Sequence, residues 1–382
     1  GATGTAAPAA TGTKPCNVPT AAPGVTAKEI TIGDVSTLSG PVPGLGRSSQ
    51  AAAQAYVAFR NSTGGVCGRK LVLKTADDGA DNGRFRSLMS ELGSKVLGFA
   101  GGVGAGDAGG ADVVTANKIP VVTTPISDGF QNAPTVFDIN PPFANPNALI
   151  GKYRYLKEHG ANKAALVYIA VDQTRSEARK QKAQMVAAGI QIVHEQEIPL
   201  STLSFDSTAR GVANSGADYL FFISEAGQSA SLAKSMADTG YKLEFQEYLT
   251  TYGSNFIELA GAAGEGTSNW IRTLPVEEAA SSPEAANFVR WMHQVAPGVP
   301  TDVFAADSWS GIKAFVDGLE ALPGPITRDA LINQLRTVHR YDAGGLLGPV
   351  DLGGKRSNGC FIGMQVVGGR WKRLAPAKGF LC

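Results

Sequence analysis

Short apolar segments alternate with longer helical segments through most of this chain, and this alternation limits the fold more than any other feature. Strands are predicted at residues 29–35, 70–75, 96–100, 119–124, 164–170, 190–197, 219–224 and 245–250. Strands that are separated by helices form right-handed crossovers within parallel sheets. The pattern therefore predicts an α/β fold built on parallel sheets.

Two breaks divide the alternation and indicate two domains. The first is Asn140-Pro-Pro-Phe-Ala-Asn-Pro146, and the second is Trp270-Ile-Arg-Thr-Leu-Pro275, which we expect to follow the last strand of the middle block. A third crossing is expected near Tyr341 to Pro349. The helical segments after the second break have no strands of their own, so we expect them to pack on the first unit; they span residues 283–295, 303–321 and 327–336. A chain of 382 residues also exceeds what one core usually holds.

The N-terminal residues 1–26 consist mostly of Gly, Ala, Thr and Pro, with Lys14 as the single charge. We predict that this segment is a flexible tether. The chain starts at Gly1 without a Met, which leaves room for a targeting segment that has been removed.

The net charge of +1, without a basic cluster, argues against nucleic-acid or membrane-surface binding. No apolar run reaches the roughly 20 residues that a membrane-spanning helix needs.

Four widely spaced cysteines, none in a Cys-x-x-Cys motif, indicate two disulfides in an exported protein. Residues 361–367 and 370–374 are predicted to form a hairpin, which brings Cys360 close to Cys382. Cys16 then remains to fix the tether to Cys67. The alternative is four buried, unreactive thiols in a cytosolic protein.

The stretch from Glu29 to Gly46 is an alternating strand that runs into a Gly- and Pro-rich turn and then a helix. Free amide donors and the positive end of the helix dipole favour an anionic ligand group at such a turn. The order of this strand, Leu38-Ser39-Gly40-Pro41, the helix and a second strand ending in Asp77-Asp78 resembles the start of type I solute-binding proteins. These are the branched-chain amino-acid (Leu/Ile/Val) binding proteins of ABC importers. The resemblance covers residues 28–375.

This resemblance implies two Rossmann-like lobes joined by three hinge crossings. Lobe 1 would comprise residues 27–140 and 275–342, and lobe 2 residues 141–274 and 343–382. The implied function is that of a monomeric receptor, not an enzyme, without cofactor or metal, which closes on a small carboxylate ligand and delivers it to an ABC permease. The implied location is extracellular, anchored by a lipid on a Cys just upstream of the tether, or periplasmic.

Several lobe 1 residues match ligand-binding positions of the family. The glycine-rich loop after residue 100 would offer backbone amides to the ligand carboxylate, and the residues after Pro125 would bind its carboxylate and ammonium groups. Leu45 and Phe304 match apolar lid positions but are equally explained as core residues, and Ser127 and Asp128 are alternatively explained as caps of the next turn. The lobe 1 candidates are Ser39, Leu45, Gly102, Val103, Gly104, Ile126, Ser127, Asp128 and Phe304.

The lobe 2 candidates are Gln173, Glu225, Thr251 and Tyr252. The family often has aromatic residues near Gln173 and Glu225, and an acid for the ligand ammonium where Thr251 stands. The ligand is therefore not a standard branched-chain amino acid, or Glu225 or Asp128 has taken over the cation contact. Bulkier aromatic, alicyclic or steroid-like acids fit the first case. Glu225 is alternatively a solvated helix cap.

Other readings remain open. Gly104, Gly106 and Gly109 form a literal Gly-x-Gly-x-x-Gly, with Asp128 placed to meet a ribose, so a nicotinamide-dependent enzyme is one alternative. A ligand-sensing ectodomain of a signalling receptor, with the same lobes, is another. The four histidines show no catalytic or metal-ligand spacing. Asp81 is better explained as a helix cap than as part of a calcium loop.

Overall fold

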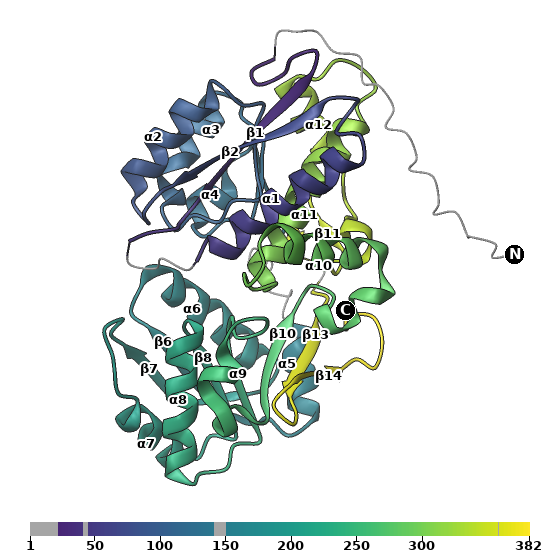
Figure 1. The fold of residues 1–382 in the computed structure, drawn as a ribbon. Coiled ribbons are helices and arrows are strands. Elements are labelled where there is room, and N and C mark those ends of the chain that lie inside the picture. The colour runs from purple at the N-terminus through teal and green to yellow at the C-terminus, as the bar shows by residue number, and fades with distance from the viewer. Residues whose placement is uncertain (1–21, 41–44, 141–149, 358) are drawn as a thin grey trace, which may run out of the picture.

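The protein, seen in a computed structural model that describes residues 22–40, 45–140, 150–357 and 359–382, has two α/β lobes (Figure 1). Each lobe is built on one main sheet, and a separate pair of short strands completes the structure. Most strands within the main sheets pair in parallel. The predicted fold class is therefore confirmed.

The first lobe contains a five-stranded parallel sheet in the order β2-β1-β3-β4-β5. Its strands are β1 (Glu29–Ser36), β2 (Lys70–Asp77), β3 (Phe99–Ala100), β4 (Val121–Thr123) and β5 (Val136–Asp138). Ser36 pairs with Asp77 at the last register position of β1 and β2, so both strands end at the same edge of the sheet. The loops that follow them therefore lie side by side.

Helices from both ends of the chain cover this sheet (Figure 1). From the first part of the chain come α1 (Arg47–Ser62), α2 (Asn82–Gly93), the 3₁₀ helix η1 (Asp107–Gly110), α3 (Ala111–Ala116) and α4 (Asp128–Asn132). From the later part come η3 (Val276–Ser281), α10 (Pro283–Val295), α11 (Val303–Glu320), α12 (Arg328–Arg336) and η4 (Ala343–Gly345).

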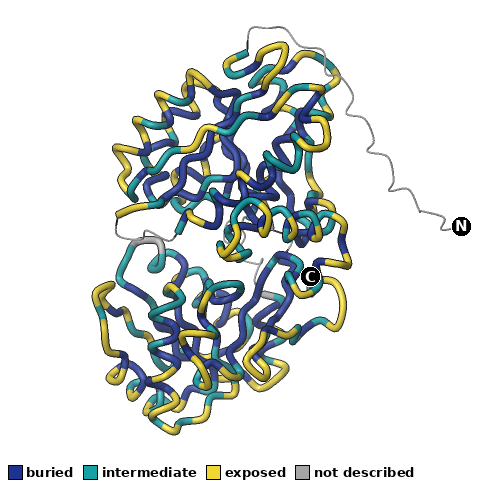
Figure 2. Tube along the Cα trace, in the orientation of Figure 1, coloured by how far each residue is buried: buried dark blue, intermediate teal, exposed yellow. Residues whose placement is uncertain are grey.

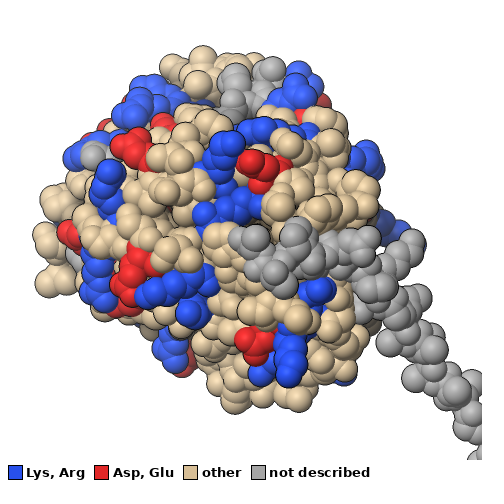
Figure 3. Space-filling model, turned by 90° about the horizontal axis from the view of Figure 1, so that it is seen from above, with Lys and Arg blue, Asp and Glu red and all other residues tan. Residues whose placement is uncertain are grey.

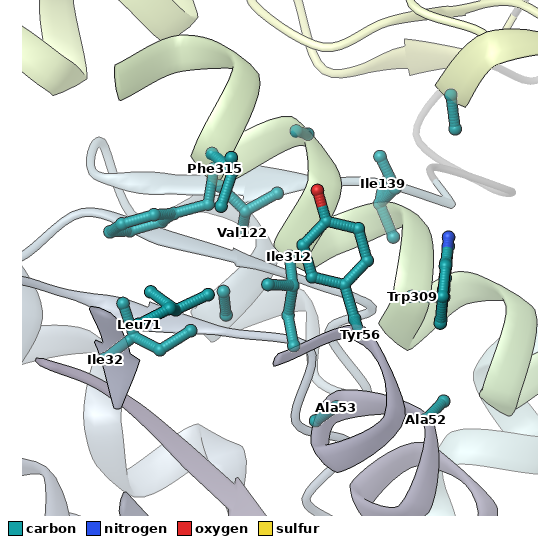
Figure 4. Close-up of a cluster of buried hydrophobic side chains, with 14 of the residues drawn as sticks. Ile32, Ala52, Ala53, Tyr56, Leu71, Val122, Ile139, Trp309, Ile312 and Phe315 are labelled. Carbon is teal, nitrogen blue, oxygen red and sulfur yellow. The ribbon is translucent and has the colours of Figure 1, made fainter. Parts of the chain in front are cut away.

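A hydrophobic core joins these early and late segments (Figure 4). Tyr56 of α1 meets Trp309 of α11 edge to face, with ring centroids 4.9 Å apart. Ile32 of β1, Leu71 of β2 and Phe315 of α11 are buried in the same cluster. Because α11 lies far beyond the second lobe in sequence, this core forms only when the chain returns to the first lobe.

The second lobe contains a seven-stranded sheet in the order β14-β13-β10-β9-β8-β6-β7. Its strands are β6 (Lys163–Ile169), β7 (Gln191–Ile198), β8 (Tyr219–Ile223), β9 (Phe245–Tyr248), β10 (Thr267–Ile271), β13 (Ile362–Val366) and β14 (Trp371–Ala375). Its helices are α5 (Ile150–Glu158), α6 (Asp172–Ala187), α7 (Asp206–Asn214), α8 (Ala226–Thr239), α9 (Phe256–Ala260) and η2 (Gly261–Gly264). As Figure 2 shows, the strands at the centre of each lobe are buried.

The second break begins later than predicted, because Trp270 and Ile271 belong to β10. This strand also contains Thr267, Ser268 and Asn269, which are buried and polar. Two of these side chains have internal acceptors: the Asn269 Nδ2 donates to the Tyr248 carbonyl at 2.6 Å, and the Ser268 Oγ donates to the Gln246 carbonyl at 3.1 Å. Because the first three residues of this strand are polar, the sequence pattern did not indicate a buried strand here.

The third crossing also lies later than predicted. Leu346, Leu347 and Leu352 are buried in the core of the first lobe. The Lys355 Nζ donates to the carbonyls of Gln131 and Ala133 at 3.0 and 2.6 Å, which attaches the short hairpin β11 (Val350–Asp351) and β12 (Arg356–Ser357) to the first lobe. The assignment of residues 343–357 to lobe 2 is therefore corrected, whereas the later strands β13 and β14 do lie in the second sheet.

The terminal hairpin and its disulfide are confirmed. Strands β13 and β14 pair antiparallel, and the Val367 amide donates to the Arg370 carbonyl across the turn at 2.8 Å. Cys360 is bonded to Cys382, with their Cα atoms 4.0 Å apart. Cys16 and the rest of the tether up to residue 21 lie outside the described residues, so the pairing of Cys16 with Cys67 stays a prediction.

Charged side chains of both signs are interspersed on the face shown in Figure 3, and neither sign forms a continuous field there. Within the described ranges, no helix is long and apolar enough to cross a membrane.

Candidate functional site

The loops after β1, β3 and β4 of the first lobe carry candidate residues, and α6 lies on the side of the second lobe that faces the first lobe (Figure 1). We call the space between these loops and the ends of β6, β8 and β9 the inter-lobe region. Asp128, at the start of α4, and Lys180, on α6, form an ion pair across it, with 3.0 Å between the Asp128 Oδ1 and the Lys180 Nζ. The Asp128 side chain is 63% exposed, so solvent weakens this pair.

The glycine-rich loop after β3 is held mostly by the first lobe itself. The Val103 amide donates to the Ser36 Oγ at 3.3 Å, and the Ala105 amide donates to the Thr37 Oγ1 at 2.8 Å. The Val103 amide is therefore already engaged, and its contact with a ligand stays a prediction. Among the described residues, no hydrogen bond uses the amides of Gly102 or Gly104, which keeps both as candidate donors.

The glycine motif of the dinucleotide reading has a packing explanation. A Cβ added at Gly106 would lie 2.6 Å from the Asp81 carbonyl oxygen, and one at Gly109 would lie 1.9 Å from that of Asn82. Glycine is therefore needed at both positions because the loop touches the backbone at the start of α2. Asp81 caps that helix, as predicted, by accepting from the Arg84 amide at 2.6 Å.

An internal carboxylate occupies two amides in the segment after Pro125, where ligand contacts were expected. The Ile126 amide donates to the Asp107 Oδ2 at 2.6 Å, and the Ser127 amide donates to the Asp107 Oδ1 at 3.0 Å. Burial raises the pKa of Asp107 to about 7, although hydrogen bonds from Ser127 and Ile126 oppose the shift. The Ser127 Oγ caps α4 by accepting from the Phe130 amide at 3.3 Å. Ser127 therefore has the capping role of the alternative explanation, and its contact with a ligand stays a prediction.

Ser39 is exposed but engaged with its own lobe. Its amide and Oγ donate to Asp77 at 3.2 and 2.5 Å. Burial pulls the pKa of Asp77 upward, but hydrogen bonds from Ser39, Leu38 and Gly79 lower it to about 2. Asp77 therefore stays ionised and keeps these donors from a ligand.

The two predicted lid positions lie at neighbouring helix starts. Leu45 precedes α1, Phe304 lies in the first turn of α11, and both are partly exposed. The Ser48 Oγ donates to the Asp302 Oδ1 at 2.7 Å, which ties the two helix starts together. Leu45 and Phe304 therefore remain candidates for an apolar contact.

Two of the second-lobe candidates, Glu225 and Thr251, are bound within their own lobe, whereas Tyr252 contacts η3 of the first lobe. Glu225 caps α8 by accepting from the amides of Gly227 and Gln228 at 2.8 and 2.7 Å. Thr251 is fully buried and donates to the Tyr248 carbonyl at 2.9 Å. Tyr252 is buried, and its hydroxyl donates to the Glu277 Oε2 at 2.5 Å. Each of these side chains already has a partner, and their contacts with a ligand stay a prediction. The side chain of Gln173 lies outside the described residues.

An arginine at the second crossing was not predicted as a site residue. Arg272 directly follows β10, and its Nη2 donates to the Asn140 carbonyl at 2.9 Å. Its Nη1 is buried and has no hydrogen-bond partner among the described residues. Burial lowers the pKa of Arg272, whereas the charges of Asp307, Asp138 and Glu177 oppose this shift.

These three carboxyl groups come from both lobes and are held by other partners. Asp138 accepts from the Asn140 amide at 2.8 Å, Asp307 from the Thr124 Oγ1 at 3.2 Å, and Glu177 from the Gln181 Nε2 at 2.5 Å. Burial raises the pKa of Asp138 and Glu177 to about 7 and that of Asp307 to about 6. In the described part of the chain, no group of three or more His, Cys, Asp or Glu residues is arranged to hold a metal.

Comparisons with known proteins agree with this architecture. Residues 29–370 match the model of the family described as periplasmic binding protein. The chain is 22% identical over 300 residues to the Leu/Ile/Val-binding protein homolog 3 of Brucella melitensis, covering 76% of this chain and 79% of that protein.

Solved structures show the same fold. A fatty acid ABC transporter substrate-binding protein from Thermomonospora curvata superposes with a TM-score of 0.78 at 21% identity, covering 94% of each chain. A solute-binding protein of R. palustris in complex with benzoate has a TM-score of 0.73 at 19% identity, covering 92% of this chain and 96% of that chain. A branched-chain amino acid transporter protein of Streptococcus pneumoniae in complex with isoleucine has a TM-score of 0.74 at 16% identity, covering 91% and 100%.

Proposed function

The chain belongs to the periplasmic binding protein family, and from this premise we propose that it is the solute-binding receptor of an ABC importer. The observation that carries the proposal is the extent of the family match, which spans both lobes and the crossings between them. The names of the similar proteins, which are transporter components, support it. The Cys360–Cys382 disulfide supports a location outside the cytosol, either periplasmic or on the cell surface.

The ligand that we propose is a small carboxylate without an ammonium group. Each acid expected to meet an ammonium is engaged elsewhere, since Glu225 caps α8 and Asp128 pairs with Lys180. Thr251 stands where the family has its ammonium-binding acid, and it is buried. Fatty acid and benzoate appear among the ligands named for similar structures, and isoleucine does too. An aliphatic or aromatic acid therefore fits better than an amino acid.

Transport would depend on hinge motion of the two lobes. A ligand that contacts both lobes binds the closed arrangement better and shifts the population toward it. The permease would then recognise the closed form. The Asp128–Lys180 pair is one contact that closure would form between the lobes.

A thermal-shift screen tests this proposal. The probes are benzoate, octanoate and isoleucine, with NADH as the probe for the dinucleotide alternative. A ligand at 100 times its Kd adds about 2.7 kcal/mol to the free energy of unfolding. We expect octanoate or benzoate to raise the Tm and NADH to leave it unchanged. A Tm raised by isoleucine alone would contradict the ligand class, and a Tm raised by NADH alone would contradict the receptor function.

A further inference from the structure

Two buried polar atoms beside the second crossing have no hydrogen-bond partner among the described residues. They are the Nη1 of Arg272, a donor, and the Oδ1 of Asn140, an acceptor. Buried polar groups in native proteins nearly always have partners, and leaving one without a partner is costly. The two atoms belong to residues that touch each other, because the Arg272 Nη2 donates to the Asn140 carbonyl at 2.9 Å. The pair therefore marks a place for a molecule that carries both an acceptor and a donor.

This place lies at the inter-lobe region. Asn140 follows β5 of the first lobe by two residues, and Arg272 follows β10 of the second. Thr124, directly after β4, and Asp307, on α11, join the same network. Thr124 also precedes the segment of Ile126 and Ser127, and Asp307 lies one turn after Phe304. Hydrogen bonds through Asp307 thus connect Asn140 to Thr124, and so to the segments at which the family resemblance placed the ligand.

We propose that the Arg272 guanidinium receives the carboxylate of the transported ligand, an assignment that rests on the proposed function. A guanidinium presents paired donors that match the two oxygens of a carboxylate, and charge-assisted pairs of this kind are strong. Backbone amides could also bind a ligand carboxylate. Two of the nearby amides, those of Ile126 and Ser127, already donate to Asp107 and offer less to a ligand. The Asn140 Oδ1 would accept from a hydroxyl next to the ligand carboxylate.

The neighbouring acids do not already fill this role. In the described part of the chain, Arg272 forms no ion pair, although Asp307, Asp138 and Glu177 act on it through their charges. Each of these acids is held by hydrogen bonds from other side chains or amides. The simplest competing explanation is a single buried water that bridges the two unpartnered atoms.

Calorimetric titration of matched acids and amides separates these explanations. The probes are benzoate and benzamide, octanoate and octanamide, and isoleucine and isoleucinamide. The variants are Arg272→Gln and Arg272→Lys. Arg328→Gln is the matched control, because Arg328 is also a partly buried arginine but donates to the carbonyls of Leu97 and Val96 inside the first lobe, at 3.0 and 2.8 Å.

We expect the best acid to bind Arg272→Gln roughly 30-fold or more weaker than the wild type, because the buried charge loses its partner. Arg272→Lys should retain intermediate affinity, since an ammonium cannot form the paired contact. The amide analogues should bind weakly to every variant, and Arg328→Gln should bind the acid as the wild type does. If Arg272→Gln does not fold, as judged by circular dichroism, Arg272→Lys decides.

Two outcomes would overturn the assignment, and they differ in meaning. If an acid binds the wild type and the Arg272 variants with equal affinity, the proposed function stays intact but Arg272 does not bind the ligand. A buried water then bridges the Arg272 Nη1 and the Asn140 Oδ1. If no acid binds the wild type, the proposed ligand class fails and the role of Arg272 fails with it.

Discussion

At the scale of single residues, Asp107 changes where a ligand acid can bind. Its carboxylate accepts from the amides of Ile126 and Ser127, two residues that the family resemblance assigned to ligand binding. A second carboxylate at the same amides would meet the charge of the first. The proposed ligand acid would therefore need another cation or donor, and the buried Nη1 of Arg272 has no hydrogen-bond partner among the described residues.

Removal of the Asp107 side chain should destabilise the first lobe. Asp107→Ala leaves the two amides without acceptors, so we expect a loss of about 1–3 kcal/mol in the free energy of unfolding. Asp107→Asn keeps one acceptor oxygen and should lose less. Urea unfolding followed by circular dichroism measures both. Equal stability of Asp107→Ala and the wild type would show that water replaces the carboxylate without cost.

Asp34 should make stability depend on pH. It is fully buried on β1, and burial raises its pKa from 3.8 to about 7, although a hydrogen bond from Ser36 opposes the shift. Between pH 4 and 7 the folded protein therefore holds a proton that the unfolded chain releases, and the free energy of unfolding falls as pH rises through this window. Below this window Asp34 is protonated in both states, so its contribution is constant there.

Asp34→Asn removes this titration. At 1.36 kcal/mol per pKa unit, we expect the variant to gain up to about 4 kcal/mol relative to the wild type on going from pH 4 to pH 8. Chemical unfolding across this range measures the difference. Asp112→Asn is the control, because the Asp112 side chain is 88% exposed. Parallel pH profiles of Asp34→Asn and the wild type would contradict the prediction.

At the scale of elements, the sequence was a good guide wherever a strand is apolar on both faces. β8 (Tyr219–Ile223) is buried at every position, and its apolar run was predicted within one residue. β10 was missed because it begins with Thr, Ser and Asn, and the buried Ser and Asn side chains hydrogen-bond to carbonyls of β9. The Ser268 Oγ, for example, donates to the Gln246 carbonyl at 3.1 Å. Such a partner is set by the tertiary fold, so the local sequence pattern does not reveal it.

The candidate site was predicted less well for a related physical reason. For Ser127 and Glu225, the sequence fits both a ligand contact and a helix cap, and only the geometry distinguishes the two. Arg272 and Asp107 act through residues from other segments, since the Asn140 carbonyl that Arg272 contacts lies 132 positions earlier. The one local signal for Arg272 was its position, as a single charge between the apolar end of β10 and Pro275.

The disulfide of the terminal hairpin should contribute measurably to stability. Cys360 and Cys382 are 22 positions apart, and the chain-entropy relation gives about 3 kcal/mol for a loop of this length. We expect the double variant Cys360→Ser/Cys382→Ser to lose an amount of this order in urea unfolding. Ligand affinity should stay unchanged, because the hairpin lies at the edge of the second sheet. A double variant as stable as the wild type would show that pairing of β13 with β14 holds the hairpin alone.

At the scale of the whole molecule, α6 links the two lobes in addition to the crossings. The Tyr153 hydroxyl donates to Gln181, which donates to Glu177, so the second lobe fixes the face of α6 that carries Glu177. From this helix, Glu177 acts on Arg272 and Lys180 pairs with Asp128. Closure of the lobes should therefore depend on the charges that α6 presents.

Reversal of one charge of the Asp128–Lys180 pair should open the lobes without unfolding them. In Asp128→Lys, two cations face each other across the inter-lobe region, whereas the wild type has an attractive pair at 3.0 Å. Exposed pairs contribute about 0–1 kcal/mol, so the affinity for the best acid should fall by at most about fivefold. The radius of gyration from small-angle X-ray scattering should increase in the ligand-free protein, and high salt should reduce the difference.

The double variant Asp128→Lys/Lys180→Asp restores opposite charges and should regain both the affinity and the compact form. Glu91→Lys is the matched control. Glu91 lies on α2 and pairs at 2.9 Å with Lys95, which follows this helix, so the pair does not join the lobes. This control should alter neither the affinity nor the radius of gyration. If Asp128→Lys behaves like Glu91→Lys, the contact between Asp128 and Lys180 does not bias closure, and the crossings alone set the arrangement of the lobes.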